Sequence, residues 1–366
     1  MNSLAKPRLA LSMPERDFLD QYQFDKVTFL QLQSSLSKGQ FSTEQNTIDA
    51  DLQPPSPADL VPWSQEKSLS QIGKDAINKG EVGIAVLNGG MATRFGGVVK
   101  GIVKVAGERS FLDLKFSDLT KWIAPTPVFV MNSFATEEAT NTHLQENDYF
   151  GLPKERVHQL VQRISLRLTP EGELFRTSDH TPSFYAPGHG DIFEVLASSP
   201  ALHRERERGL RYILVSNVDN LGANLSPAVI GAHILGKKPV TVEVAPRNPG
   251  DKGGAPAYVN GRLEIVEGFR FPPGFDHETL PVFNTNTFVF NTEVFDSTYP
   301  LTWFRADKTV ENQGVIQFER LMGQITHFLD TNYLLVPRTG SSNRFMPIKT
   351  PRDLEVLAPI IKDRFT

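Results

Sequence analysis

Short apolar runs that end in turn residues recur along the chain from residue 82 onward. The first reads Val82-Gly83-Ile84-Ala85-Val86-Leu87 and is followed by Asn88-Gly89-Gly90. Such runs are typical of strands that are buried on both faces of a sheet. Similar runs span residues 127–131, 212–216 and 240–244, and helical patterns lie between the runs at about 113–122, 135–146 and 191–198. This alternation predicts an α/β fold with a mostly parallel sheet flanked by helices.

Two later segments depart from this alternation. In residues 258–266, alternating side chains flank Asn260-Gly261, which predicts a tight β-hairpin. Residues 282–290 predict a second antiparallel element. We therefore expect a mixed sheet, in which parallel strands dominate.

The first part of the chain has a different texture. Apolar side chains are scattered among polar ones and are expected on one face of short helices (Phe18, Tyr22, Phe24, Phe29 and Leu30). Residues 53–63 are rich in proline and cannot form a regular helix, whereas residues 68–79 have a helical pattern. We divide the chain into an N-terminal helical extension with a connector, residues 1–75, and a single α/β domain with a short C-terminal tail, residues 76–366.

The composition argues against several classes of protein, namely those that bind nucleic acid, span a membrane or depend on disulfides. The 366 residues are enough for a large core, and the net charge of −4 gives no basic field for nucleic acid or an anionic membrane. No apolar run is long enough to span a bilayer, and the first thirty residues lack the apolar core and cleavage site of a signal peptide, so we expect none. Cysteine is absent, which excludes disulfides and fits a reducing compartment. We expect a cytoplasmic protein that binds neither nucleic acid nor membrane.

The first strand runs into a glycine-rich loop, residues 88–100. Glycine backbone can approach a ligand closely, and its amides can point at phosphate oxygens. Arg94 and Lys100 add positive charge for a polyphosphate. The loop has neither the Gly-Lys-Ser/Thr of a Walker loop nor the spacing of a dinucleotide fingerprint. A turn with two solvated cations stays open as the alternative.

An aspartate lies next to each of two predicted elements. Asp219 lies just past the run at 212–216, where ligands bind in open α/β sheets, and an acidic residue there suits Mg²⁺ between phosphates. The alternative is an aspartate that caps the next turn. Asp191 precedes the helical pattern at 191–198, and we expect it to cap that helix.

These segments together resemble the UDP-glucose pyrophosphorylase family, whose members are UTP–glucose-1-phosphate uridylyltransferases. The resemblance covers about residues 82–355. It rests on segments that occur in the family's order and spacing, namely the loop at 87–100 and residues 111–114, 131–134, 187–192, 216–223, 252–254, 283–286, 315–319 and 344–350.

The resemblance implies a Rossmann-like nucleotidyltransferase fold of the glycosyltransferase-A type. It also implies reversible, Mg²⁺-dependent formation of UDP-glucose and pyrophosphate from UTP and glucose 1-phosphate. The phosphate of the sugar attacks the α-phosphorus of UTP in line with the leaving pyrophosphate, which needs positioning and charge neutralisation more than a covalent nucleophile.

Roles for individual residues follow from the same resemblance. The nucleotide is bound by Leu87, Gly89, Gly90, Gln162, Gly188 and Asn217. The phosphates are contacted by the catalytic residues Arg94, Lys100, His189 and Lys349, with Asp219 as the metal ligand. The sugar is contacted by Lys252, Gly254, Glu267 and Asn286. Without the resemblance, we would interpret Lys349 as a surface charge, Asn286 as a turn residue and Glu267 as a solvated carboxylate.

The sequence also departs from the family. Ala92 stands where glycine is usual, and Val98-Val99 replaces the usual Gly-Pro before Lys100. Two alternatives therefore stay open: a pyrophosphorylase for another sugar, such as an N-acetylhexosamine or galactose, and a weakly active protein that binds nucleotide sugars. Few residues follow Lys349-Thr350 in this sequence, so we expect the C-terminal β-helix of eukaryotic members to be missing. We expect a monomer or a small homo-oligomer.

Overall fold

The computed structural model describes residues 9–64, 67–251 and 253–365. In this part of the chain, eight strands form a central sheet in the order β2-β19-β13-β16-β12-β3-β8-β9. Their bounds are Leu60–Pro62 (β2), Val82–Leu87 (β3), Val128–Asn132 (β8), Val157–Val161 (β9), Tyr212–Asn217 (β12), Val240–Pro246 (β13), Val282–Asn291 (β16) and Thr331–Leu335 (β19). All neighbours pair in parallel except β16, which runs antiparallel to β12 and β13. The predicted mixed, mostly parallel α/β fold is confirmed.

Alternating side chains of the strands build a core on each face of the sheet. On β3, Ile84 and Val86 point to one face, and Ala85 and Leu87 to the other. The first face is covered by α3 (Lys67–Asn78), α4 (Phe111–Ser117), α5 (Glu137–Glu146), α8 (Pro227–Gly236) and α10 (Pro351–Phe365). The second is covered by α6 (Ile192–Ala197), α7 (Pro200–Glu207) and α9 (Ile325–Phe328). Burial on both faces explains why the strands read as continuous apolar runs.

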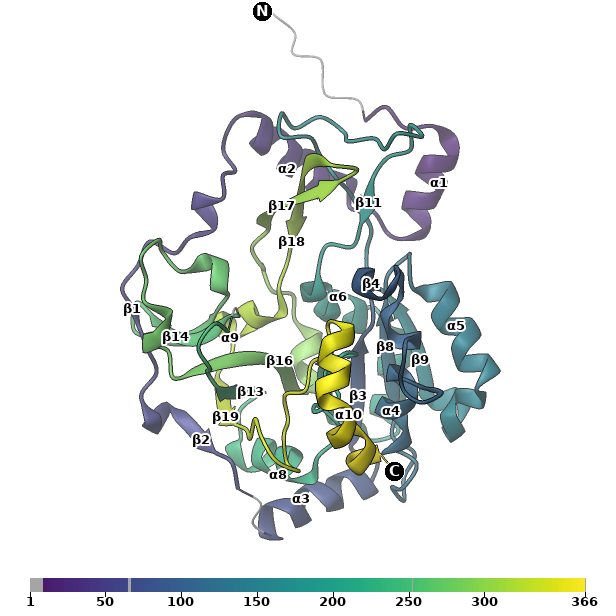
Figure 1. Cartoon of the computed structure of the whole chain (residues 1–366), viewed down its shortest axis with the longest axis vertical. Coiled ribbons are helices and arrows are strands. Elements are labelled where there is room, and N and C mark those ends of the chain that lie inside the picture. The colour runs from purple at the N-terminus through teal and green to yellow at the C-terminus, as the bar shows by residue number, and fades with distance from the viewer. Residues whose placement is uncertain (1–8, 65–66, 252, 366) are drawn as a thin grey trace, which may run out of the picture.

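Smaller elements frame the sheet (Figure 1). At one end, α1 (Met13–Gln21) and α2 (Lys26–Ser37) pack with the β17–β18 hairpin (Phe304–Val310 and Gln313–Glu319) and the pair β10–β11 (Ser165–Leu166 and Phe184–Tyr185). At the side, β1 (Leu52–Gln53) joins the hairpin of β14 (Ala255–Val259) and β15 (Arg262–Val266). The hairpin predicted around Asn260-Gly261 is confirmed. A further short pair is β6 (Lys104–Ala106) with β7 (Arg109–Ser110).

The N-terminal segment is integrated with the rest of the chain. Strand β2 is an edge strand of the central sheet, and the boundary between residues 75 and 76 falls inside α3. Phe29 of α2 is buried beside Ile316 and Phe318 of β18. The two expected parts therefore share a core in the described structure.

One predicted helix is wrong in its extent. The helix expected at 113–122 is α4, which ends at Ser117, and residues 118–122 form turns. Asp118 is the C-cap residue, and its side chain accepts a hydrogen bond of 2.7 Å from Asn224 Nδ2. This tertiary contact belongs to a loop about a hundred residues away, so the local pattern does not contain it. Among the described residues, no helix has the length and apolar content needed to cross a bilayer.

Candidate functional site

A cavity of about 330 Å³ opens where four parallel strands end. Its lining comes from the residues at and after the carboxyl ends of β3, β8, β9 and β12, together with the loop that precedes α6. Because these strands are parallel, their carboxyl ends meet at one edge of the sheet, which is where ligands bind in such folds. The lining residues are Leu87, Gly89, Gly90, Lys100, Met131, Gln162, Ala186, Gly188, His189, Asn217, Val218 and Asp219. The structure thus brings all of the predicted nucleotide-binding residues together.

The glycine loop folds back as a small hairpin beside this cavity. Strand β4 (Met91–Ala92) pairs with β5 (Val98–Val99), and Gly96 and Gly97 make the turn with positive φ. The departure at Val98-Val99 thus forms one strand of the hairpin, and the extended backbone of β4 suits alanine at position 92. A Cβ added to Gly90 would meet no atom within 4 Å, so its backbone faces open space.

Gln162 lies directly against the glycine loop. A Cβ added to Gly89 would lie 1.9 Å from Gln162 Nε2, so a side chain at position 89 would displace the Gln162 amide. The Gln162 side chain is buried, and its Oε1 has no hydrogen-bond partner among the described residues. A buried polar atom without a partner is costly, and in a binding site it is available for a ligand donor.

Lys100 and Asp219 form an ion pair at the floor of the cavity. Asp219 is 6% exposed, and its backbone carbonyl accepts the N–H of Ile348 at 3.0 Å. No group of three or more His, Cys, Asp or Glu residues suited to a metal exists in the described residues. Among the described lining residues Asp219 is the one carboxylate, which suits a metal whose other ligands are phosphate oxygens and water.

His189 and Gly188 occupy a loop held by Arg320. A Cβ on Gly188, whose φ is 100°, would lie 2.6 Å from the Arg320 carbonyl oxygen. Nδ1 of His189 accepts the Met322 N–H at 3.0 Å, so the ring carries its proton on Nε2. Burial lowers the pKa of His189 to about 4. His189 is therefore a neutral hydrogen-bond donor near pH 7.

Asp191 does not cap α6, so that prediction is wrong. It occupies the N-cap position, but its side chain makes no capping hydrogen bond. Instead, it accepts the Arg163 backbone N–H at 3.2 Å and pairs with Arg320 at 2.6 Å. Arg320 also pairs with Glu194 at 2.6 Å and lies 4.5 Å over the ring of Trp303. The sequence reasoning missed Arg320, because only the fold brings it to this loop.

The predicted sugar residues lie beside the nucleotide cavity. Asn286 Nδ2 donates to Asn217 Oδ1 at 3.1 Å, and Asn286 N–H donates to Asn284 Oδ1 at 2.9 Å. Asn284 N–H in turn donates to the Gly254 carbonyl at 2.7 Å. Gly254 and Glu267 line a neighbouring cavity of about 600 Å³, and a Cβ on Gly254 would lie 3.0 Å from Glu267 Oε2. A chain of hydrogen bonds thus connects the two cavities.

Two of the predicted residues, Arg94 and Lys349, lie apart from the described lining of these cavities. Arg94 is exposed between β4 and β5, and Lys349 is exposed just after Ile348, and neither belongs to the described lining of either cavity. Lys349 N–H donates to Asp353 Oδ2 at 2.9 Å. Lys252 lies outside the described residues, so its predicted role has no structural counterpart here.

Two sequence comparisons fit this geometry. Residues 28–360 match the family described as UTP–glucose-1-phosphate uridylyltransferase. Over 339 residues, the chain is 28% identical to UTP–glucose-1-phosphate uridylyltransferase 2 of Dictyostelium discoideum, covering 85% of this chain and 64% of that protein. The chain covers 62% and 60% of the matching proteins of Schizosaccharomyces pombe and Encephalitozoon cuniculi. It thus spans less than two thirds of the length of these relatives.

Solved structures give the same fold. A point mutant of the UDP-glucose pyrophosphorylase from Leishmania major matches with a TM-score of 0.72 at 26% identity, over 95% of this chain and 79% of that one. The UDP-N-acetylglucosamine pyrophosphorylase from Trypanosoma brucei, solved with an inhibitor, matches with a TM-score of 0.74 at 19% identity, over 95% of this chain and 85% of that one. The second likeness concerns the fold alone.

Proposed function

The chain belongs to the UTP–glucose-1-phosphate uridylyltransferase family, and we propose that it makes UDP-glucose and pyrophosphate from UTP and glucose 1-phosphate. The cavity at the carboxyl ends of the parallel strands carries this proposal. It combines a glycine loop, a buried amide without a partner and the Lys100–Asp219 ion pair. These are groups suited to phosphates, to a base edge and to a phosphate-bound cation, respectively.

The buried amide of Gln162 supports uracil binding. Uracil offers an N–H donor beside carbonyl acceptors on one edge, and the Gln162 amide offers an acceptor and donors. Gly188 lines the same cavity with its backbone, which can contact the base, and a side chain at this position would collide with the Arg320 carbonyl oxygen. The glycine loop then receives the phosphates through Gly89, Gly90 and the ammonium of Lys100.

Asp219 is the residue that would hold Mg²⁺. One carboxylate is enough when the phosphates of the nucleotide supply further oxygen ligands, and Asp219, the one acidic side chain among the described lining residues, fits that arrangement. When bound, the ion would neutralise phosphate charge and favour departure of pyrophosphate. Lys100 must then release Asp219 and turn to the phosphates, which lie in the same cavity.

The reaction follows from the charges around the phosphates. A phosphate oxygen of the sugar 1-phosphate forms a bond to the α-phosphorus of UTP, and the bond from that phosphorus to the bridging oxygen of pyrophosphate breaks. Lys100 stabilises the negative charge of the phosphates during transfer. His189 donates a hydrogen bond to them from Nε2 and stays neutral. Arg94 and Lys349 are exposed on neighbouring segments, and we propose that they close on the phosphates when substrates bind.

Specificity for the sugar depends on the second cavity. Asn286 and Gly254 can contact hydroxyl groups of the sugar, and burial raises the pKa of Glu267 to about 7. A carboxyl group there can accept or donate a hydrogen bond near neutral pH. Glucose is the sugar named for the family, and we propose it for this chain. We also propose a cytoplasmic enzyme that works as a monomer or a small homo-oligomer.

A substrate panel tests the proposed function. Purified protein is mixed with UTP, Mg²⁺ and one of glucose, galactose or N-acetylglucosamine 1-phosphate, and pyrophosphate release is followed. We expect glucose 1-phosphate to give the highest kcat/KM. A preference for another sugar would reassign the substrate. Binding of UTP without turnover of any sugar phosphate would indicate a nucleotide-binding protein instead.

A further inference from the structure

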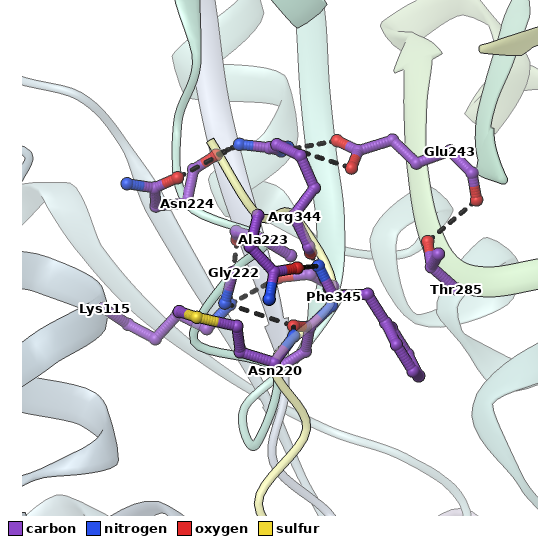
Figure 2. Close-up of polar contacts among 12 residues, drawn as sticks. Lys115, Asn220, Gly222, Ala223, Asn224, Glu243, Thr285, Arg344 and Phe345 are labelled. Atoms are coloured by element: carbon purple, nitrogen blue, oxygen red, sulfur yellow. Dashed lines mark hydrogen bonds and ion pairs between the residues drawn. The ribbon is translucent and has the colours of Figure 1, made fainter. Parts of the chain in front are cut away.

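Behind the nucleotide cavity lies a buried polar cluster that includes Arg344, Glu243, Asn220, Asn224 and Lys115, and we call it the Arg344 cluster. Arg344 is 2% exposed, and Glu243 is fully buried. The Arg344 guanidinium binds both oxygens of Glu243, at 3.0 and 2.5 Å, and donates to the carbonyl and side-chain oxygens of Asn224, both at 3.0 Å. Figure 2 shows Arg344 reaching between Asn224 and Glu243.

The cluster joins the Asp219 loop to the segment that carries Lys349. Asn220 Oδ1 accepts the Met346 N–H at 2.8 Å, and Asn220 Nδ2 donates to the Arg344 carbonyl at 3.3 Å. Ile348 N–H donates to the Asp219 carbonyl at 3.0 Å. The two backbones are so close that a Cβ on Gly222 would lie 2.4 Å from the Arg344 carbonyl carbon. Movement of Arg344 would therefore move the metal carboxylate and the phosphate lysine together.

The same cluster reaches the strand that carries Asn286. Glu243 lies on β13 at a register shift, because Glu243 pairs with Thr287 whereas Val244 pairs with Asn284. Thr285 and Asn286 therefore bulge out of β16, and Thr285 Oγ1 donates to the Glu243 carbonyl at 2.8 Å. Asn286 has a φ of 56° and donates to Asn217 in the nucleotide cavity. Glu243 thus supports the bulge that presents Asn286.

Lys115 anchors both ends of the Asp219 loop. From α4, its Nζ donates to Ser216 Oγ at 3.0 Å, just before Asn217, and to the Ala223 carbonyl at 2.8 Å. Arg364 of α10 holds the far side of the cluster, donating to Asn224 Oδ1 at 2.9 Å. Three buried or half-buried basic side chains therefore lie around Glu243, and their desolvation cost makes net stability a weak explanation for this arrangement.

We propose that the Arg344–Glu243 pair is a positioning pair for the transfer reaction. It fixes Asp219, Lys349 and Asn286 relative to one another, although these residues come from three segments far apart in the sequence. Neither Arg344 nor Glu243 lines the cavity, so the pair acts through the residues it holds. This inference rests on the proposed function, because it gives each of those three residues its role there.

The variant Glu243→Gln tests this with a matched control. It keeps the shape of the side chain and removes the charge that binds Arg344. The control is Glu205→Gln on α7, which removes an equally buried carboxylate that pairs with Arg156 at 3.1 Å and His158 at 2.9 Å, outside the lining of the nucleotide and sugar cavities. Measurements are the melting temperature, kcat, KM for UTP and the Mg²⁺ concentration that gives half-maximal rate.

We expect both variants to melt at lower temperature and only Glu243→Gln to lose catalysis. Its kcat should fall by about 10- to 100-fold, since small displacements of positioned groups cost that much. Its KM for UTP should change by less than about threefold, because Gln162 and the glycine loop do not touch the cluster. The half-maximal Mg²⁺ concentration should rise. A kcat equal to that of the control would overturn the proposal.

Two further arms cover other outcomes. If Glu243→Gln does not fold, Asn224→Ala is the alternative variant. It keeps both charges of the pair and removes the hydrogen bond from Arg344 to the Asn224 side chain, so a smaller fall in kcat is expected. An unchanged kcat contradicts the role of the pair. If wild-type protein turns over no sugar phosphate, the proposed function fails. Calorimetry of Mn²⁺ with UTP then tests positioning alone, where Glu243→Gln must bind the Mn²⁺–UTP complex more weakly than Glu205→Gln.

Discussion

The nucleotide cavity and the Arg344 cluster lie next to each other and are both polar, but their polar groups differ in how far they are satisfied. In the cavity, Gln162 Oε1 has no partner in the described structure, and glycine backbone faces open space. In the cluster, Arg344 is bound on every side. Unsatisfied groups cost stability and are available to a ligand, whereas satisfied groups hold the backbone in place. Changes in the two regions should therefore act differently on binding, rate and stability.

The largest expected effect lies at Asp219. Asp219→Ala removes the only carboxylate among the described lining residues of the cavity, and we expect the rate to fall by about a thousandfold or more, because a metal held between phosphates is lost. Stability should change little, since the side chain forms an ion pair only with Lys100 in the described structure. The measurements are pyrophosphate release and thermal unfolding.

A matched control for this change is Asp113→Ala. Asp113 is a partly buried carboxylate that pairs with Arg109 at 2.8 Å on α4, away from the cavity. It should lose some stability and keep the rate. Near-normal turnover by Asp219→Ala would refute the metal role of Asp219. The polar groups of the cavity would then differ less from those of the Arg344 cluster in their effect on the rate.

An intermediate effect is expected at Gln162. Gln162→Met removes a buried oxygen without a partner, so the protein should be as stable as the wild type or more stable. UTP should bind about 10- to 100-fold more weakly, since the base then leaves polar groups unpaired. Calorimetric titration with UTP and thermal unfolding measure both quantities.

Gln159 provides the comparison for Gln162. It lies on β9, which Gln162 directly follows, but its amide accepts from Asn132 at 3.1 Å and donates to Asn141 at 2.9 Å. Gln159→Met should therefore lower stability and leave UTP binding intact. If both variants weakened UTP binding equally, the unsatisfied oxygen of Gln162 would have no special role.

The smallest effect on activity is expected at Lys115, where the change appears in the pH dependence of stability. Burial, with help from Arg344, lowers the pKa of Lys115 to about 7. The unfolded chain then binds more protons than the folded one between about pH 7 and the ordinary lysine pKa. The free energy of unfolding should rise with pH across that window, by on the order of a few kcal/mol in total.

Replacing Lys115 by methionine should flatten this rise. Urea unfolding of wild type and Lys115→Met at several values between pH 6.5 and 9 measures the slope, with the exposed Lys121→Met as control. Parallel curves for wild type and Lys115→Met would show that Lys115 keeps its proton when the protein is folded.

The local pattern predicted the parts of the fold that depend on neighbouring residues. The buried strands β3, β8, β12 and β13 appear as apolar runs, because both faces of each are covered. The hairpin at Asn260-Gly261 follows from turn chemistry. The end of α4 did not follow from the pattern, because Asp118 is bound by Asn224 from another segment. The cap predicted for Asp191 failed for the same reason, since Arg320 takes its side chain.

The predicted site residues also fall into two groups, those that the structure brings into the cavity and those that it leaves outside. The resemblance of the chain's segments to the family led to Gly89, Gln162, Gly188, Asn217 and Asp219, and the parallel strands bring them to one cavity. Arg94 and Lys349 were predicted at the phosphates and are exposed outside the described lining of the cavity. Their predicted roles depend on movements that the arrangement of strands does not specify.

The sequence by itself determined the α/β fold and the residues that line the nucleotide cavity, because a buried strand and the loop after it are contiguous in the chain. Only the tertiary structure decided what holds that cavity in shape. Arg320 and the Arg344–Glu243 pair are ordinary charged residues in the sequence, and their partners are separated from them by a hundred residues or more. Burial makes such charges depend on particular partners, and the folded chain alone determines which partners those are.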